Sequence, residues 1–217
     1  MNRSDADTLW RVAGCLARDA AKVSRATDRP RPNLPPLLFF TDPERTPEPW
    51  TVAARLPAGS GVVYRHFGAP DALETARRLR QATRARDGLL LIGRDPDLAE
   101  AVEADGVHLP EVLIGEAARL ADRHPGWILT AAFHALSPLP DLTGLDALIV
   151  SPVFPAGGAS AGKAPLGVER LKALTAATDR PIYALGGMDA SNAPQLIGSG
   201  VYGMAGVGSF RAAFGPD

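Results

Sequence analysis

Eight short apolar runs, separated by stretches of helical character, constrain the fold of this chain more than any other feature. They lie at about 37–41, 61–67, 88–93, 106–109, 127–134, 146–154, 182–185 and 203–208. Short runs that are apolar at almost every position are typical of parallel strands buried on both faces. Their alternation with helical segments favours a parallel sheet. Eight such repeats predict an α/β fold, a single-domain (β/α)8 TIM barrel.

A doubly wound open sheet is the alternative fold for this alternation. That fold carries G-x-G-x-x-G after its first strand when it binds a dinucleotide, and the segment that follows residues 37–41 has no such motif. The barrel is therefore the preferred interpretation.

The N-terminal segment precedes the first predicted strand and is expected to be an addition to the barrel. Apolar residues recur at helical spacing up to about Arg25, and the proline-rich RPRPNLPP follows. We expect residues 1–36 to form a helix and a proline-rich linker packed on a barrel of residues 37–217. Few residues follow Phe210, so we expect a shortened C-terminal end, with the N-terminal helix covering either part of that gap or one end of the barrel.

Composition argues against several classes of function. The formal net charge is −1, which gives no electrostatic footprint for nucleic acid or a membrane surface. The single cysteine, Cys15, supports neither a disulfide framework nor a metal cluster. We find neither a signal-peptide pattern nor an apolar run of the roughly 20 residues that a membrane helix needs. These observations predict a cytoplasmic protein.

Glycines at the ends of the last two predicted strands suggest a phosphate site. Gly186 and Gly187 follow the seventh strand, and Gly206, Val207 and Gly208 end the eighth. Bare backbone at these two neighbouring loops is typical of the phosphate grip of such barrels, because peptide N–H groups can reach an anion there. The alternative is that the glycines only permit tight strand-to-helix turns.

Three side chains complete the predicted site, each with a structural alternative. Arg65, near the end of the second strand, is a candidate for binding an anionic group, or else for an ion pair in the barrel mouth. Lys163, in a Gly/Ala/Ser-rich loop, is a candidate for a phosphate or pyrophosphate, or else a solvated lysine. His134, after the fifth strand, is a candidate general acid and base, or else a structural histidine. His108 fits a structural role better.

A metal site is not evident from the sequence. Asp42 is the one carboxylate well placed at a strand end, since Asp95 and Asp97 fit helix starts better. The chain lacks the Walker and zinc-ligand patterns. We therefore predict no protein metal ligands.

Several segments in chain order, from Leu37 to Phe210, resemble one family. The most specific are ADGVHLP, PVFP…KAPLG and ALGG. They resemble the thiamine phosphate synthase family and its thiazole tautomerase relatives. The resemblance implies a (β/α)8 barrel in thiamine biosynthesis, often a homodimer, with a small-molecule phosphate substrate. The synthase joins a pyrimidine methyl pyrophosphate to a thiazole phosphate with magnesium. The tautomerase isomerises a thiazole carboxylate phosphate without a metal.

Departures from the synthase pattern favour the tautomerase. Where synthases have Gln-x-Arg-x-Lys, this chain keeps only Arg65, with Phe67 in the place of the lysine, and Arg94 stands where an acidic residue helps to hold magnesium. His134 matches the tautomerase histidine that moves a proton. We therefore expect a metal-independent thiazole tautomerase with no cofactor. A divergent thiamine phosphate synthase, which would need magnesium, and a non-catalytic phosphate-ligand-binding or regulatory paralogue are the alternatives.

Overall fold

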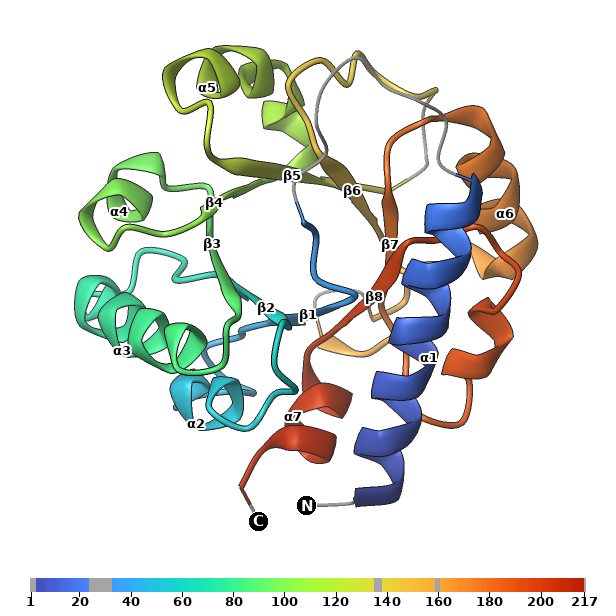
Figure 1. Ribbon diagram of the computed structural model, residues 1–217, viewed down its shortest axis with the longest axis horizontal. Coiled ribbons are helices and arrows are strands. Elements are labelled where there is room, and N and C mark those ends of the chain that lie inside the picture. The colour runs from blue at the N-terminus through green and yellow to red at the C-terminus, as the bar shows by residue number, and fades with distance from the viewer. Residues whose placement is uncertain (1–2, 24–32, 135–137, 159–160, 217) are drawn as a thin grey trace.

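Eight parallel strands pair in chain order, and the last pairs with the first, so the sheet closes into a barrel (Figure 1). The computed structural model describes residues 3–23, 33–134, 138–158 and 161–216. The strands are β1 (Leu37–Phe40), β2 (Gly61–Tyr64), β3 (Leu89–Gly93), β4 (Gly106–Leu109), β5 (Ile128–Phe133), β6 (Ala147–Val150), β7 (Ile182–Leu185) and β8 (Gly203–Gly206). The predicted TIM barrel is confirmed.

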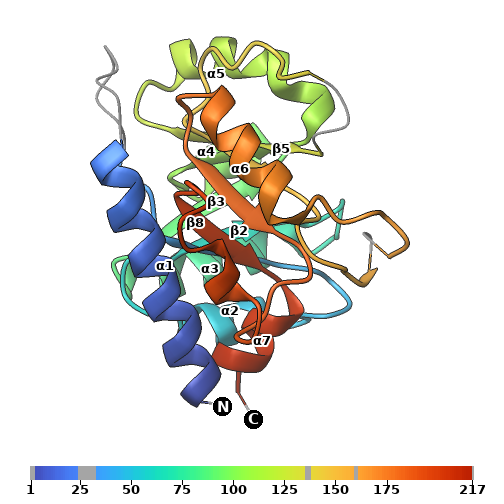
Figure 2. The same cartoon turned by 90° about the vertical axis from the view of Figure 1, so that its right-hand side faces the viewer.

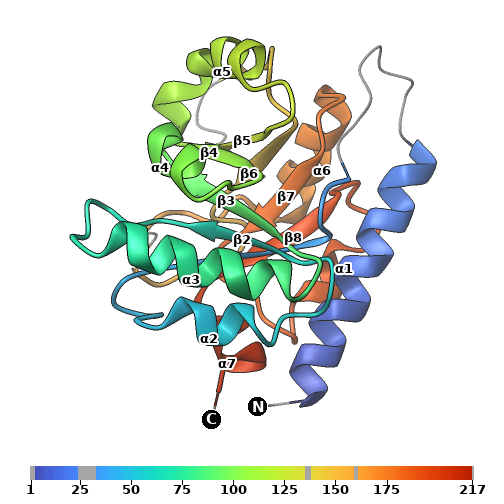
Figure 3. The same ribbon diagram turned by 60° about the vertical axis from the view of Figure 1, so that its left-hand side comes forward.

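Helices surround the barrel on its outer face, as Figures 1 and 3 show. They are α1 (Arg3–Val23), α2 (Pro49–Ala53), α3 (Ala72–Arg84), α4 (Pro96–Ala101), α5 (Ala117–Arg123), α6 (Gly167–Ala177) and α7 (Gly208–Phe214), with 3-10 turns η1 (Glu111–Glu116) and η3 (Ala193–Leu196). Asp95 begins α4, since its side chain accepts a hydrogen bond from the N–H of Leu98, as expected for a helix cap.

The strands are apolar on both faces because each face packs in a different core. Inside the barrel, alternate strand residues such as Leu38, Phe40, Val63 and Ile149 form one cluster. The residues between them, for example Phe39 and Val62, point outward and pack with the helices in a second, larger cluster. The near-continuous apolar runs of the sequence follow from this double burial.

Helix α1 covers the side of the barrel where the outer layer is thinnest. Its apolar stripe is buried and comprises Ala6, Leu9, Val12, Ala13 and Leu16. The helix contacts β8, η3 and the short α7, and lies alongside them in Figure 2. The predicted shortening of the C-terminal end, and its cover by the N-terminal helix, are confirmed. Most of the predicted linker, residues 24–32, lies outside the described residues.

Two connecting segments contain short helical turns. The proline-rich segment after β1 contains α2, with Pro49 in the first turn, where proline is tolerated. After Gly187, a turn closed by the Asp189 side chain leads to the 3-10 turn η3, which contains Pro194.

Some strands are also shorter than predicted, so that Arg65 and His134 lie just beyond the ends of β2 and β5. Within the described residues, no helix is long and apolar enough to cross a membrane.

Candidate active site

A cavity of about 1060 Å³ lies at the carboxyl ends of the strands. This is the end at which barrels of this kind carry their sites. All eight residues predicted for the site line it: Arg65, His134, Lys163, Gly186, Gly187, Gly206, Val207 and Gly208. The sequence-based selection therefore falls in one place, although the role of each residue has to be argued from its surroundings.

The glycine pair after β7 forms a tight left-handed turn. Gly186 and Gly187 have φ of 97° and 65°, in the left-handed region that favours glycine. A Cβ at Gly187 would overlap the carbonyl oxygen of Pro155. Phe154 N–H donates to the Gly186 carbonyl over 3.0 Å, and Asn192 Nδ2 donates to the Gly187 carbonyl over 2.8 Å. The tight turn alone explains these glycines, and it also fixes how their peptide groups face the cavity.

The second glycine set, after β8, divides into a packed and an open position. A Cβ at Gly206 would overlap the ring of Phe210, so packing requires glycine there. A Cβ at Gly208 would meet no described atom within 4 Å, and its backbone is not left-handed. Neither packing nor backbone conformation explains Gly208. Its position on the cavity lining, next to Val207, leaves room for a ligand to approach the backbone.

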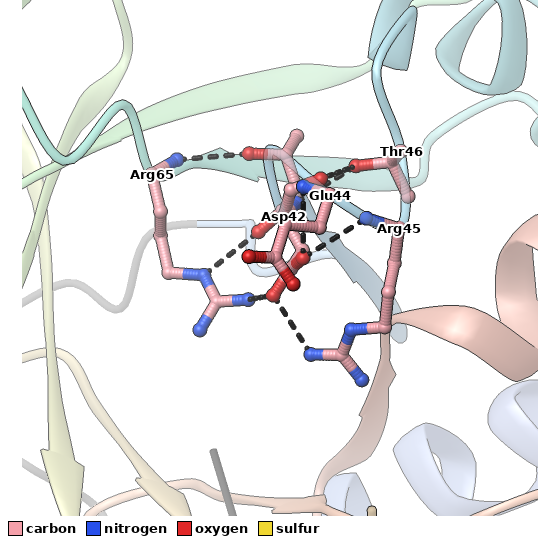
Figure 4. Close-up of polar contacts among 6 residues, drawn as sticks. Asp42, Glu44, Arg45, Thr46 and Arg65 are labelled. Carbon is pink, nitrogen blue, oxygen red and sulfur yellow. Dashed lines mark hydrogen bonds and ion pairs between the residues drawn. The ribbon is translucent and has the colours of Figure 1, made fainter. Parts of the chain in front are cut away.

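On the side of β1 and β2, two arginines share one carboxylate (Figure 4). Asp42 Oδ2 accepts a 2.8 Å hydrogen bond from Arg45 and lies 3.8 Å from Nη2 of Arg65. The hydrogen bond from the Arg45 side chain, aided by the charges of both arginines, lowers the pKa of Asp42 below its usual value. Arg65 also donates through Nε to the Thr41 carbonyl over 2.8 Å. The predicted alternative, an ion pair in the barrel mouth, is therefore present.

Arg65 also remains available to a ligand. Its guanidinium lies between the rings of Phe40 and Phe67, each centroid 5.5 Å from Cζ. Burial lowers its pKa and the nearby Asp42 opposes this, yet an arginine remains protonated. Its Nη2 is covered and has no hydrogen-bond acceptor among the described residues. Such an unsatisfied donor in a buried cation is uncommon. The Arg65 side chain is 24% exposed and lines the cavity, so its accessible part can bind an anionic ligand.

Further cations line the cavity. Arg94, after β3, is exposed, and β3 is four strands from β7 in the ring, so Arg94 faces the glycine pair across the barrel. Lys163 is exposed on the loop after β6, of which residues 159–160 are outside the described part. That loop passes over Arg45, because a Cβ at Gly158 would lie 3.0 Å from the Arg45 guanidinium carbon. Arg94 therefore places positive charge across the mouth from the glycine pair, whereas Lys163 and Arg45 lie on loops that follow the neighbours of β7 and β8.

His134 is held in one orientation after β5. Its backbone N–H donates to Glu111 Oε2 over 3.0 Å, and its Nδ1 lies 3.1 Å from the Ser151 carbonyl oxygen and 3.4 Å from Ser151 Oγ. A carbonyl oxygen only accepts, so we assign the proton to Nδ1 of the neutral ring. Nε2 is then the basic nitrogen. No described residue bonds to Nε2, so the oriented imidazole can move a proton to or from a ligand.

His108 has a different character, as expected. Its ring lies inside the barrel, with Nδ1 3.0 Å from Thr130 Oγ1 and an edge-to-face contact with Phe40. Burial, with a smaller contribution from Arg65, lowers the pKa of His108 from 6.5 to about 3. The ring is therefore neutral at working pH and serves as a hydrogen-bonding part of the cavity floor.

The sequence interpretation assigned no role to Arg45 or Phe67, which also line the cavity. Arg45 follows Asp42 by three residues in the first loop, and this position in a loop after a strand was the available signal. For Phe67 the available signal was its place in the family pattern, where synthases have a lysine. What either side chain contacts follows only from the fold.

The residues present do not fit a magnesium site. In the described part of the chain no three His, Cys, Asp or Glu residues are grouped so that they could hold a metal. Two carboxylates line the cavity, and both have partners. Asp95 caps α4 and lies 3.2 Å from Nε2 of His66, and Asp189 accepts hydrogen bonds from Ser191. Magnesium bound to a phosphate ligand needs one or two carboxylates free to bind it.

Comparison with known proteins gives one consistent result. A family model described as thiamine monophosphate synthase matches residues 37–210. The thiamine-phosphate synthase of Pyrococcus furiosus is 30% identical over 183 residues, covering 82% of this chain and 87% of that protein. The putative thiamine-phosphate synthase 2 of Aquifex aeolicus is 33% identical over 137 residues, covering 62% and 73%. The solved thiamine phosphate pyrophosphorylase from Pyrococcus furiosus matches with a TM-score of 0.67 and 26% identity, covering 84% and 92%.

Proposed function

The chain belongs to the thiamine monophosphate synthase family, and on that premise we propose that it is a transferase of the thiamine-phosphate-synthase type. Such an enzyme joins a pyrimidine methyl pyrophosphate to a thiazole phosphate and releases pyrophosphate. The relatives named above support this reaction more than the isomerisation expected from the sequence alone.

One observation carries the proposal: a single cavity has two different ends suited to anions. The glycine turns after β7 and β8 offer backbone groups on one side, and Arg65 and Arg94, after β2 and β3, offer guanidinium groups on the other. A volume of about 1060 Å³ accommodates two small molecules at once. Two phosphorylated substrates that must meet would need this arrangement, with one phosphate group anchored at each end.

The ligand assigned to each side of the cavity follows from the groups that the protein offers there. The glycine turns hold the thiazole phosphate, because N–H groups and absent side chains permit close approach. The arginines hold the pyrophosphate. When the bond to the leaving pyrophosphate breaks, negative charge grows on its oxygens, and a guanidinium already fixed in place stabilises that charge. Arg65 suits this role because Asp42 and Thr41 fix its position.

Magnesium is not assigned a step. The family resemblance implies it for a synthase, but the carboxylates that line this cavity already have partners. Arg94 stands where the resemblance places an acidic residue that helps to hold the metal. The residues of the chain alone are assigned roles in the transfer.

A thiazole tautomerase is the second candidate, and His134 favours it. The contact between Nδ1 and the Ser151 carbonyl leaves Nε2 as a base at the cavity, and an isomerisation needs only one group that removes and returns a proton. Both candidate reactions would use the same glycine turns to bind the thiazole phosphate. A non-catalytic phosphate-binding role remains the third possibility, distinguished by binding without turnover.

A paired assay tests the proposal. The purified protein is incubated with the pyrimidine pyrophosphate and the thiazole phosphate, with magnesium and separately with EDTA, and pyrophosphate release is followed. Release that requires both substrates is the expected result. Conversion of a thiazole carboxylate phosphate to its aromatic isomer in EDTA, without any pyrophosphate release, would support the tautomerase instead. Binding of a thiazole phosphate with neither reaction would leave the protein as a binder.

A further inference from the structure

The loop directly after β2 contains a turn whose sequence does not suit its shape. Ala69 N–H donates to the His66 carbonyl over 2.9 Å, and the two central residues, Phe67 and Gly68, have φ of 49° and 81°. Positive φ at both central positions is the pattern of a type I′ turn, which prefers Asn-Gly. Gly68 fits this preference. Phenylalanine at the first central position is unusual, because a bulky side chain disfavours the left-handed region.

The setting of Phe67 distinguishes it from ordinary left-handed residues. Four described residues other than glycine have positive φ. Glu103 directly follows the C-cap of α4, and Asp87 lies two residues after the C-cap of α3; a left-handed residue is common where a helix ends. Phe67 and Arg94 instead line the cavity. Backbone strain that persists at a cavity wall points to a role in the site.

Burial does not explain the phenylalanine. Its side chain is 71% exposed, so it removes little apolar surface from water in compensation for the strain. Its ring lies 5.5 Å from the guanidinium carbon of Arg65, which holds it near a cation at the cavity mouth. An aromatic face that stays open beside a cation is suited to a ligand with both a flat ring and a negative charge.

We propose that Phe67 is a ligand-stacking residue. Its open face packs on a planar aromatic or heteroaromatic ring whose phosphate or pyrophosphate group is bound by Arg65. The inference rests on the proposed function for the identity of the natural ligand, but it concerns the recognition of the ring, which the arginines alone do not provide. It makes Phe67 a determinant of specificity for aromatic over aliphatic phosphates.

Two probes of similar size separate ring recognition from charge recognition: phenyl phosphate, which is planar, and cyclohexyl phosphate, which is not. Calorimetry on the full chain measures the affinity for each. The wild-type protein is expected to prefer phenyl phosphate by about two- to tenfold, the range of an aromatic pair. Phe67→Asn should abolish the preference while inorganic pyrophosphate still binds, and Phe67→Trp should retain it.

The choice of asparagine guards against a trivial loss of folding. Asn-Gly is the favoured pair for this turn, so Phe67→Asn should melt at the wild-type temperature or above it. Ile197→Ala, which truncates another exposed apolar residue away from the cavity lining, should keep the preference. A lower melting temperature for Phe67→Asn would indicate a structural role, and an unchanged preference for phenyl phosphate in that variant would overturn the proposal.

The outcome is separable from that of the proposed function. If pyrophosphate is released from the two substrates but Phe67→Asn leaves the phenyl preference intact, the transferase stands and the stacking role fails. If the preference depends on Phe67 but neither reaction occurs, the stacking role stands and the transferase fails.

Discussion

Arg65 and Asp42 form a loose ion pair, with 3.8 Å between Nη2 and Oδ2, because the same carboxylate oxygen already accepts a 2.8 Å hydrogen bond from Arg45 (Figure 4). The pair ties the loop after β2 to the loop after β1. It also leaves Nη2 without a hydrogen bond inside the described structure. Arg65 is therefore positioned by the fold but not saturated by it.

Arg65→Met is expected to weaken the binding of inorganic pyrophosphate by about tenfold or more, the loss of one charge-assisted hydrogen bond. Calorimetry measures the affinity directly. Arg84→Met, on the outer face of α3 where Arg84 pairs with Glu103, removes the same charge from the chain without touching the cavity. Equal losses in the two variants would mean that net charge, rather than the Arg65 site, attracts the anion.

His134→Gln separates the two candidate reactions. Glutamine can still donate to the Ser151 carbonyl but cannot exchange a proton, so any isomerase activity should fall by at least about 100-fold. The rate of pyrophosphate release should change by only a few fold, because the proposed transferase reaction gives the imidazole no role. Steady-state rates of both reactions provide the measurement. A hundredfold loss of pyrophosphate release would instead place His134 in the transfer itself.

His108 makes stability depend on pH. Between about pH 6.5 and pH 3 the unfolded chain binds a proton at His108 that the folded chain does not, because burial lowers the folded pKa to about 3. The free energy of unfolding should therefore fall as the pH falls through this window, by up to about 1.4 kcal/mol per pH unit from this residue.

His108→Gln, which can keep a hydrogen bond to Thr130, should reduce that slope. Urea unfolding at pH 7, 6 and 5 provides the measurement. The difference between variant and wild type should be constant above pH 7.5. Equal slopes between pH 6 and pH 5 would show that His108 does not titrate in this way.

Alanine substitution at two glycines of the cavity should affect different properties: stability at Gly187 and phosphate affinity at Gly208. Gly187→Ala combines a left-handed φ of 65° with a steric overlap on Pro155, and should cost about 2 kcal/mol or more of stability. Gly208→Ala places its methyl group in open space and should change stability by less than about 0.5 kcal/mol, while weakening phosphate binding several-fold. Thermal melts and phosphate titrations test both. Unchanged phosphate affinity in Gly208→Ala would remove that residue from the grip.

The fold could be predicted largely because burial shapes the strands on both faces. Residues such as Phe39 and Phe40 are adjacent yet pack in different cores, and this leaves a continuous apolar signature in the sequence. The predictions were weaker where local rules compete. Helix α2 was not predicted, because proline-rich sequence is typical of loops. Proline is nevertheless tolerated in the first turn of a helix, where Pro49 lies.

The site was predictable only in part. Strand-end positions and glycine spacing placed Arg65, His134 and the two turns on one cavity. These rules did not predict the pairing of Asp42 with two arginines, because Arg65 lies on a different loop from Asp42. They also did not predict the left-handed turn at Phe67, because phenylalanine is unusual in that conformation. The sequence pattern favoured a tautomerase, whereas the named relatives are thiamine-phosphate synthases and favour the transferase.

A competition titration shows whether the cavity binds two phosphorylated molecules at separate places. Thiazole phosphate is titrated into the protein alone and into the protein saturated with inorganic pyrophosphate. We expect thiazole phosphate to bind with stoichiometry near one in both cases, and Arg65→Met to weaken only the binding of pyrophosphate. Displacement of one ligand by the other would show a single shared site and rule out the two-site cavity.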